Sequence, residues 1–73
     1  MDRLGAIEAF AKLSEAEAGV LQLLVGFLTV AEIAGALGQS AGTVRAQTAV
    51  IYRKLGVYRR RDAIRRAREL GLV

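Results

Sequence analysis

The side chains in this sequence that can do chemistry are mostly basic, and they cluster in its second half. Residues 45–73 hold nine of the 11 lysines and arginines against two acidic residues, whereas residues 1–44 hold two basic against five acidic residues. Guanidinium and ammonium groups bind phosphate oxygens and base edges through charge-assisted hydrogen bonds. The pattern therefore predicts a polyanionic partner, either nucleic acid or an anionic membrane surface, and the alternative is a solvated helix face.

Catalysis is disfavoured by what the sequence lacks. The 73 residues include no histidine and no cysteine, which removes the commonest general base, the commonest metal ligands and any disulfide. There is also no nucleophile–base pair and no phosphate loop of the Walker type, so we expect neither an enzyme nor a bound metal or cofactor. No apolar run approaches the roughly 20 residues of a membrane span. The start also lacks the pattern of a signal peptide, so we expect one small cytoplasmic domain.

Helices must position the basic residues, because the chain has no proline and no strand-like alternation. Two capping boxes, SEAE at 14–17 and TVAE at 29–32, place a serine or threonine three residues before a glutamate. They predict one helix that ends near Gly26 and a short helix of about Val30–Leu37, which Gly38 closes.

A third helix begins about two residues after the second one ends. Ser40 caps it, it runs over about Ala41–Leu55, and Gly56 stops it. Two helices joined by a tight turn that contains glycine form a helix-turn-helix, whose second helix is free to enter a groove. A fourth helix is expected from residue 60 or 61 to residue 70, so the chain belongs to the all-α class.

Apolar residues at helical spacing predict the buried side of each helix. They are Val20, Leu21, Leu24 and Val25 in the first helix, Ile33, Ala34 and Leu37 in the second, Val44, Thr48, Ile51 and Leu55 in the third, and Ile64, Ala67 and Leu70 in the fourth. Residues 1–12 form an additional N-terminal helix or a linker stub before the domain at 13–73. We favour a cover for the core or a partner surface there, because Leu4, Ile7 and Phe10 would otherwise form an exposed apolar patch.

Three stretches of the chain resemble, in register, the DNA-binding domain of LuxR/GerE-type bacterial transcription regulators. They are LSEAEAGVLQLL, LTVAEIAGALGQSAGTVRAQTAVIYRKLGV and RRRDAIRRARELGLV, and together they cover about 13–73. The resemblance implies a tetrahelical bundle whose third helix enters the major groove of double-stranded DNA. It also implies homodimers on inverted half-sites, often paired through the fourth helix. The ending RARELGL is similar to the C-terminal domains of MalT-like regulators, which implies an upstream ATPase or sensor domain in a longer chain.

The resemblance further implies DNA contacts from the exposed side of the third helix. Family members commonly have a basic residue at the position of Arg45, and they often read bases or backbone at the positions of Ala46 and Ala49. Arg45 can bind guanine O6 and N7 or hold a phosphate, and a solvated arginine is the alternative. The methyl groups of Ala46 and Ala49 can touch thymine, or these residues simply favour the helix.

Two kinds of group are expected to contact phosphates. Thr29, Ser40 and Thr43 lie at helix N-termini, where free amides bind anions, but these residues cap their helices with or without DNA. The basic candidates are Arg53, Lys54, Arg59, Arg60 and Arg61, and each can neutralise a phosphate. The alternative for Arg53 and Lys54 is a solvated side chain, and the alternative for the run 59–61 is that it repels a second copy of the chain and limits dimerisation. A lipid surface is a weaker interpretation of the arginine run, because few large apolar residues accompany it in the fourth helix.

Several positions depart from the family pattern, mostly where the family contacts DNA. The usual histidine of the third helix is Gln47, the small polar cap of the fourth helix falls at Arg59, and a position that is often polar or basic is Ala49. Further departures are Ala16, Gly19, Val30 and Ala31. The alternative function is therefore a degenerate helix-turn-helix used for protein–protein interaction or for weak nonspecific DNA binding.

Overall fold

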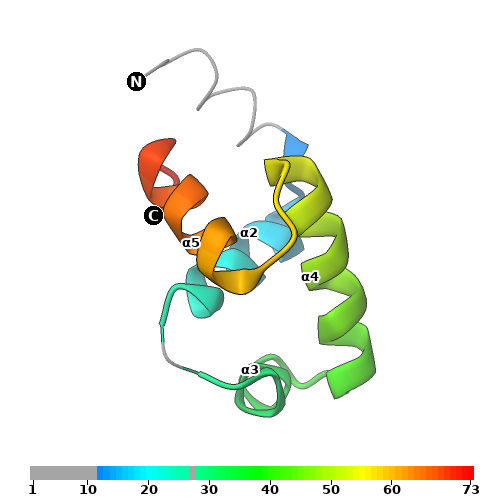
Figure 1. The fold of residues 1–73 in the computed structure, drawn as a ribbon. Coiled ribbons are helices and arrows are strands. Elements are labelled where there is room, and N and C mark those ends of the chain that lie inside the picture. Colours follow the sequence, from blue (N-terminus) through cyan, green and yellow to red (C-terminus); the bar gives the residue numbers. More distant parts are fainter. Residues whose placement is uncertain (1–11, 27) are drawn as a thin grey trace.

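The computed structural model describes residues 12–26 and 28–73, and within this part the chain is all-α. Its helices are α2 (Glu15–Leu24), α3 (Val30–Leu37), α4 (Ala41–Leu55) and α5 (Arg60–Glu69) (Figure 1). The predicted fold class and the bounds of α3 and α4 are confirmed. The additional helix or linker expected over 1–12 lies outside the described residues, apart from Lys12.

Side-chain caps define the first turns of α2 and α3. The Ser14 hydroxyl accepts a hydrogen bond from the Glu17 amide at 3.0 Å, and Glu17 Oε1 accepts one from the Ser14 amide at 2.8 Å. Thr29 and Glu32 repeat this arrangement at 3.1 and 2.8 Å. Both predicted capping boxes are therefore present, and each satisfies two backbone amides that a helix start leaves free.

Glycines with left-handed backbone close α3 and α4. Gly38 has φ 66° and Gly56 has φ 72°. The amide after each glycine reaches back to the helix, from Gln39 to the Ala34 carbonyl and from Val57 to the Tyr52 carbonyl, both at 2.9 Å. These bonds end the two helices sharply and turn the chain toward its next element.

The buried side chains come from all four described helices, from Leu13 just before α2 and from Leu70 just after α5. They are Leu13, Val20, Leu21, Leu24, Ile33, Ala34, Val44, Ile51, Leu55, Ala63, Ala67 and Leu70, together with Thr48. The predicted buried side is confirmed along α4 and for three of the four positions in α2. Val25, the fourth, is half-buried because α2 has already ended there.

Two inward positions were predicted wrongly. Leu37 is 38% exposed, because it is the last residue of a short helix and lies beyond the contact with the core. Ile64 is half-buried, and Ala63 is fully buried in its place. The inner side of α5 consists of Ala63, Ala67 and Leu70, so the small alanines bring this helix close to the core and Ile64 falls on its flank.

The helices pack around one core so that α4 and α5 lie on different sides of the molecule. α3 and α4 form the helix-turn-helix, α2 contacts both of them, and α5 contacts α4. Figure 1 shows α4 on the right, α5 on the left, α2 behind them and α3 at the bottom. Within residues 12–26 and 28–73, no helix has both the length and the apolar composition that crossing a bilayer requires.

Candidate nucleic-acid interface

The outward side of α4 is bare. Its inward side is buried, whereas Gly42, Ala46, Ala49 and Arg53 are exposed on the opposite side. Sequence reasoning identified Ala46, Ala49 and Arg53 but missed Gly42, although its spacing of four residues from Ala46 could have revealed it. Three of these four side chains are a hydrogen atom or a methyl group, so a flat or grooved partner can approach the helix backbone closely.

Arg45 lies on the flank of this surface, one turn into α4. Its side chain is exposed, as predicted. The buried Thr48 hydroxyl donates a hydrogen bond to the Arg45 carbonyl at 2.8 Å, which satisfies that hydroxyl within the helix. The Arg45 side chain therefore extends to solvent from a turn of α4 whose carbonyl accepts this additional hydrogen bond.

The hydroxyl groups at the helix starts are exposed but already engaged. Ser40 Oγ accepts a hydrogen bond from the Thr43 amide at 3.1 Å and shares another with Thr43 Oγ1 at 2.9 Å. Thr29 Oγ1 accepts from the Glu32 amide at 3.1 Å. A phosphate at either helix start would therefore meet the remaining first-turn amides, with Thr43 as the hydroxyl nearest to the outward side of α4.

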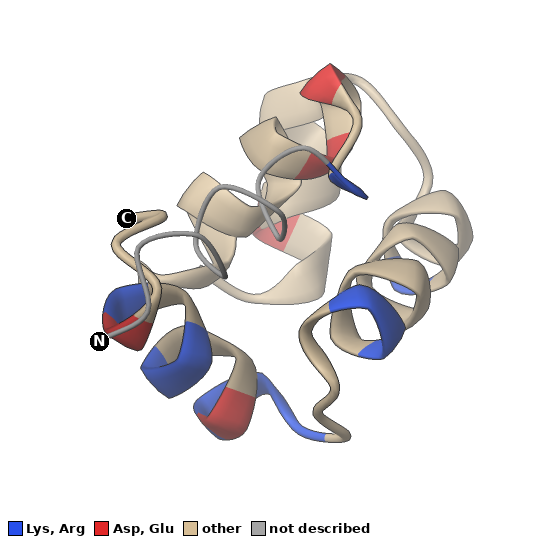
Figure 2. Cartoon of the chain, turned by 90° about the horizontal axis from the view of Figure 1, so that it is seen from above, with Lys and Arg blue, Asp and Glu red and all other residues tan. Residues whose placement is uncertain are grey.

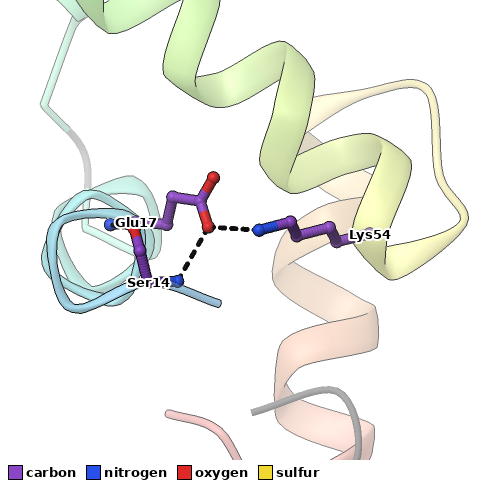
Figure 3. A network of polar contacts seen from close by, with 3 residues as sticks. All are labelled: Ser14, Glu17 and Lys54. Atoms are coloured by element: carbon purple, nitrogen blue, oxygen red, sulfur yellow. Dashed lines mark hydrogen bonds and ion pairs between the residues drawn. The ribbon is translucent and has the colours of Figure 1, made fainter. Parts of the chain in front are cut away.

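Lys54 is bonded within the fold, although sequence reasoning assigned it to phosphate. Its Nζ donates to Glu17 Oε1 at 2.6 Å, and the same oxygen accepts from the Ser14 amide (Figure 3). The Lys54 hydrogen bond, followed by the Ser14 amide, lowers the pKa of Glu17. This contact joins the end of α4 to the start of α2 across 37 residues of sequence.

Arg60 is also bonded within the fold. Its Nε and Nη2 donate to the Leu24 carbonyl at 3.1 and 3.0 Å, and Nη2 also donates to the Gly26 carbonyl at 3.1 Å. Its half-buried guanidinium therefore serves as a cap for the C-terminus of α2. The local sequence of Arg60 predicted phosphate binding, because nothing in an arginine run distinguishes the member that the fold uses.

The other basic candidates are exposed but do not all lie together. Arg53 belongs to the last turn of α4, and Arg59 precedes α5 without a side-chain cap. Arg61 instead shares the outer side of α5 with Arg65 and Arg68, where it lines an open hollow. Figure 2 shows the basic residues gathered along α5 and near the end of α4, and acidic residues on α5 as well as on other helices.

Gln47, which stands where the family has histidine, does not belong to the outward side. It is half-buried, and its Oε1 is buried without a hydrogen-bond partner among the residues that the structure describes.

A bundle in which α3, a short turn and an exposed α4 form a helix-turn-helix defines a class of DNA-binding domains. A family model described as GerE, bacterial regulatory proteins of the luxR family, matches residues 11–67. The chain therefore belongs to the luxR family of bacterial regulatory proteins, and its domain is the DNA-binding module of a transcription regulator. Comparisons with curated proteins and with solved structures gave no match.

Proposed function

We propose that the module binds double-stranded DNA with a preference for sequence, through the outward side of α4 in the major groove. The observation that carries this proposal is the bare surface of Gly42, Ala46 and Ala49 between two exposed arginines, Arg45 and Arg53. A helix fits the major groove when its outward residues are small enough for close approach. Arg45 then reads a base edge, and the alanine methyl groups contact thymine.

Phosphate contacts surround this surface. Arg53 and Arg59 neutralise backbone charges near the end of α4, and the free amides at Thr29, Ser40 and Thr43 receive phosphates at the helix starts. Lys54 and Arg60 are left out of the set, because each already bonds within the fold. The salt dependence of binding should therefore be smaller than the basic composition alone would suggest.

The regulator assembles on its target. Two copies bind inverted half-sites and associate weakly without DNA, because the outer side of α5 carries like charges. The resemblance of the chain's ending to MalT-like regulators supports an ATPase or sensor domain upstream. Because bacterial DNA lies in the cytoplasm, the module acts there.

The test begins with duplexes selected from a random pool by the wild-type chain, followed by fluorescence anisotropy at several salt concentrations. Arg45→Ala should lose about 1–3 kcal/mol of discrimination between selected and unrelated duplexes. Arg53→Ala should weaken binding to every duplex alike and reduce the salt slope by about 0.9. Arg66→Ala, on an exposed residue of α5, is the control and should change neither quantity.

The alternative is a degenerate module that contacts another protein through the same side of α4. The observation that favours it is Val50, an apolar residue that is only half-buried on this helix. A wild-type chain that selects no duplex and shows no salt-dependent binding would support this alternative. If the wild type binds DNA but neither Arg45→Ala nor Arg53→Ala changes binding, the assigned surface is wrong.

A further inference from the structure

Lys54 and Glu17 form an ion pair beside the proposed DNA-binding side of α4. Of the three ion pairs in the described part of the chain, it alone joins two helices, and its Nζ–Oε1 distance is 2.6 Å. The other two pairs lie within α5, between residues three apart, at 3.5 and 3.6 Å. The Lys54–Glu17 pair is therefore the tightest of the three and the one that depends on the tertiary fold.

Lys54 lies on the flank of α4 that faces the start of α2. It follows Thr43, Gln47 and Val50 at intervals of four, three and four residues, so these side chains share one flank of the helix. Arg45 lies on the opposite flank, because the nine positions from 45 to 54 make about two and a half turns. A helix in the major groove lies between two sugar–phosphate backbones, and its two flanks face them. Lys54 therefore faces the same backbone as Thr43, which the proposed function assigns to a phosphate.

The start of α2 holds the Glu17 carboxylate in place. Its Oε1 accepts a hydrogen bond from the Ser14 amide at 2.8 Å as well as the one from Lys54 (Figure 3). The Glu17 side chain is only 13% exposed, against 31% for Lys54. If Lys54 turned to a phosphate, this carboxylate would lose its charged partner at a partly buried site and would lie near a second negative charge. Both effects are unfavourable, so the pair resists exchange of Glu17 for a phosphate.

We infer that Glu17 lowers the affinity of the module for DNA by competing with the phosphate backbone for Lys54. The inference rests on the proposed function, because it concerns the same helix in the same groove. A phosphate contact carries no sequence information, so Glu17 lowers the affinity for every duplex alike and leaves discrimination to the outward side of α4. Weaker phosphate binding shortens the time that the module spends on unrelated DNA, which offers far more sites than the target does.

Glu17→Gln tests the inference, because an amide removes the negative charge and can still complete the capping box. Fluorescence anisotropy should show a salt slope steeper by about 0.9, since one more phosphate is neutralised. The affinities for selected and unrelated duplexes should rise together by about two- to fivefold at low salt, the range of one exposed ion pair. Glu15→Gln makes the same charge change at an exposed position in the same first turn and should leave the slope unchanged.

Variants of Lys54 separate competition for the lysine from simple repulsion of DNA by Glu17. Lys54→Met alone should keep the wild-type slope, because the lysine neutralises no phosphate in the wild type. Adding Glu17→Gln to Lys54→Met should not steepen the slope, because no ammonium group is released. Circular dichroism checks that each variant is folded. The ¹⁵N-labelled wild type gives a test without any variant, since the Lys54 Nζ signal should not shift when a duplex is added.

Four results would overturn the inference. Glu17→Gln could leave the slope unchanged, Glu15→Gln could steepen it equally, Glu17→Gln could still steepen it beside Lys54→Met, or the Lys54 Nζ signal could shift on DNA. Failure of the proposed function is recognised separately, by a wild type that binds no duplex or by Arg53→Ala leaving the salt slope unchanged. A wild type whose slope depends on Arg53 but not on Glu17 refutes this inference alone.

Discussion

The guanidinium of Arg60 satisfies carbonyl oxygens that α2 leaves free at its C-terminus. α3 and α4 end on left-handed glycines, whereas α2 ends on Val25 with right-handed backbone and has no basic residue in its last turn. The positive charge of Arg60 also opposes the negative end of the α2 dipole. One side chain from α5 thus does for α2 what Gly38 and Gly56 do for α3 and α4.

Removing this cap should cost stability. Arg60→Ala should lower the free energy of unfolding by about 1–2 kcal/mol, because two carbonyls lose a charged donor at a partly buried site. Arg60→Lys should recover only part of the loss, since an ammonium group cannot reproduce the planar fork. Urea denaturation followed by circular dichroism measures both changes. Arg61→Ala is the matched control, and the cap contributes nothing if the two alanine variants prove equally stable.

At the scale of the elements, glycine has opposite effects inside a helix and at its end. Gly19 lies within α2 and is exposed, and an added Cβ would meet nothing within 4 Å. Gly56 closes α4 at φ 72°, where an added Cβ also meets open space. The effect of a substitution at Gly56 on stability is therefore set by the backbone conformation alone.

Alanine should therefore stabilise the chain at Gly19 and destabilise it at Gly56. Gly19→Ala should raise the free energy of unfolding by about 0.5–1 kcal/mol through helix propensity. Gly56→Ala should lower it by about 1–2 kcal/mol, because a side chain disfavours left-handed backbone. Thermal unfolding of the two variants beside the wild type is sufficient to test this pair. Equal shifts of the same sign would contradict the assignment of the α4 end.

Local signals in the sequence predicted the helices well, but they did not predict the contacts between residues far apart in the sequence. Helix caps act within a few residues, so the sequence alone can predict them. They are the capping boxes at Ser14 and Thr29 and the helix ends at Gly38 and Gly56. The Arg60–Leu24 hydrogen bonds join residues 36 apart and depend on how α5 packs.

The candidate site was predictable to the same extent. The exposure of Arg45, Ala46 and Ala49 follows from the helical period, and the structure agrees. The hydrogen bond between Lys54 and Glu17 does not follow from the helical period, because these residues lie 37 positions apart. The inward side of α5 was misjudged for a related reason, since an isoleucine is more apolar than an alanine and only close packing explains why Ala63 is buried instead.

The whole molecule should resist changes of pH over a broad range and lose stability outside it. The sequence contains no histidine and no cysteine, the side chains whose ordinary pKa values lie nearest to neutrality. Glu17 and Glu32 have pKa values below the ordinary 4.5, through Lys54 and the Ser14 amide for Glu17 and through the Thr29 amide for Glu32. Their stabilisation is complete above the pKa of the unfolded chain and disappears as the pH falls through the lower folded pKa.

Stability should also fall at alkaline pH, through a tyrosine. Burial raises the pKa of Tyr52 above the ordinary 10.0, an effect that Arg60 partly offsets, so the folded chain keeps a proton that the unfolded chain loses. Urea midpoints should therefore be flat across neutral pH, fall below about pH 4.5 and fall again above about pH 10. Glu17→Gln should flatten the acid side, and an unchanged acid slope in this variant would refute the role of the Lys54 pair.

α2 is held at both ends by side chains from the other half of the chain. Lys54 bonds its first turn and Arg60 bonds its last carbonyls, while Val20, Leu21 and Leu24 are buried between them. Local detachment of this helix must break both attachments and expose the core, which approaches the cost of complete unfolding. We therefore expect amide hydrogen exchange in α2, α4 and α5 to report one shared opening event, as it does in a single foldon.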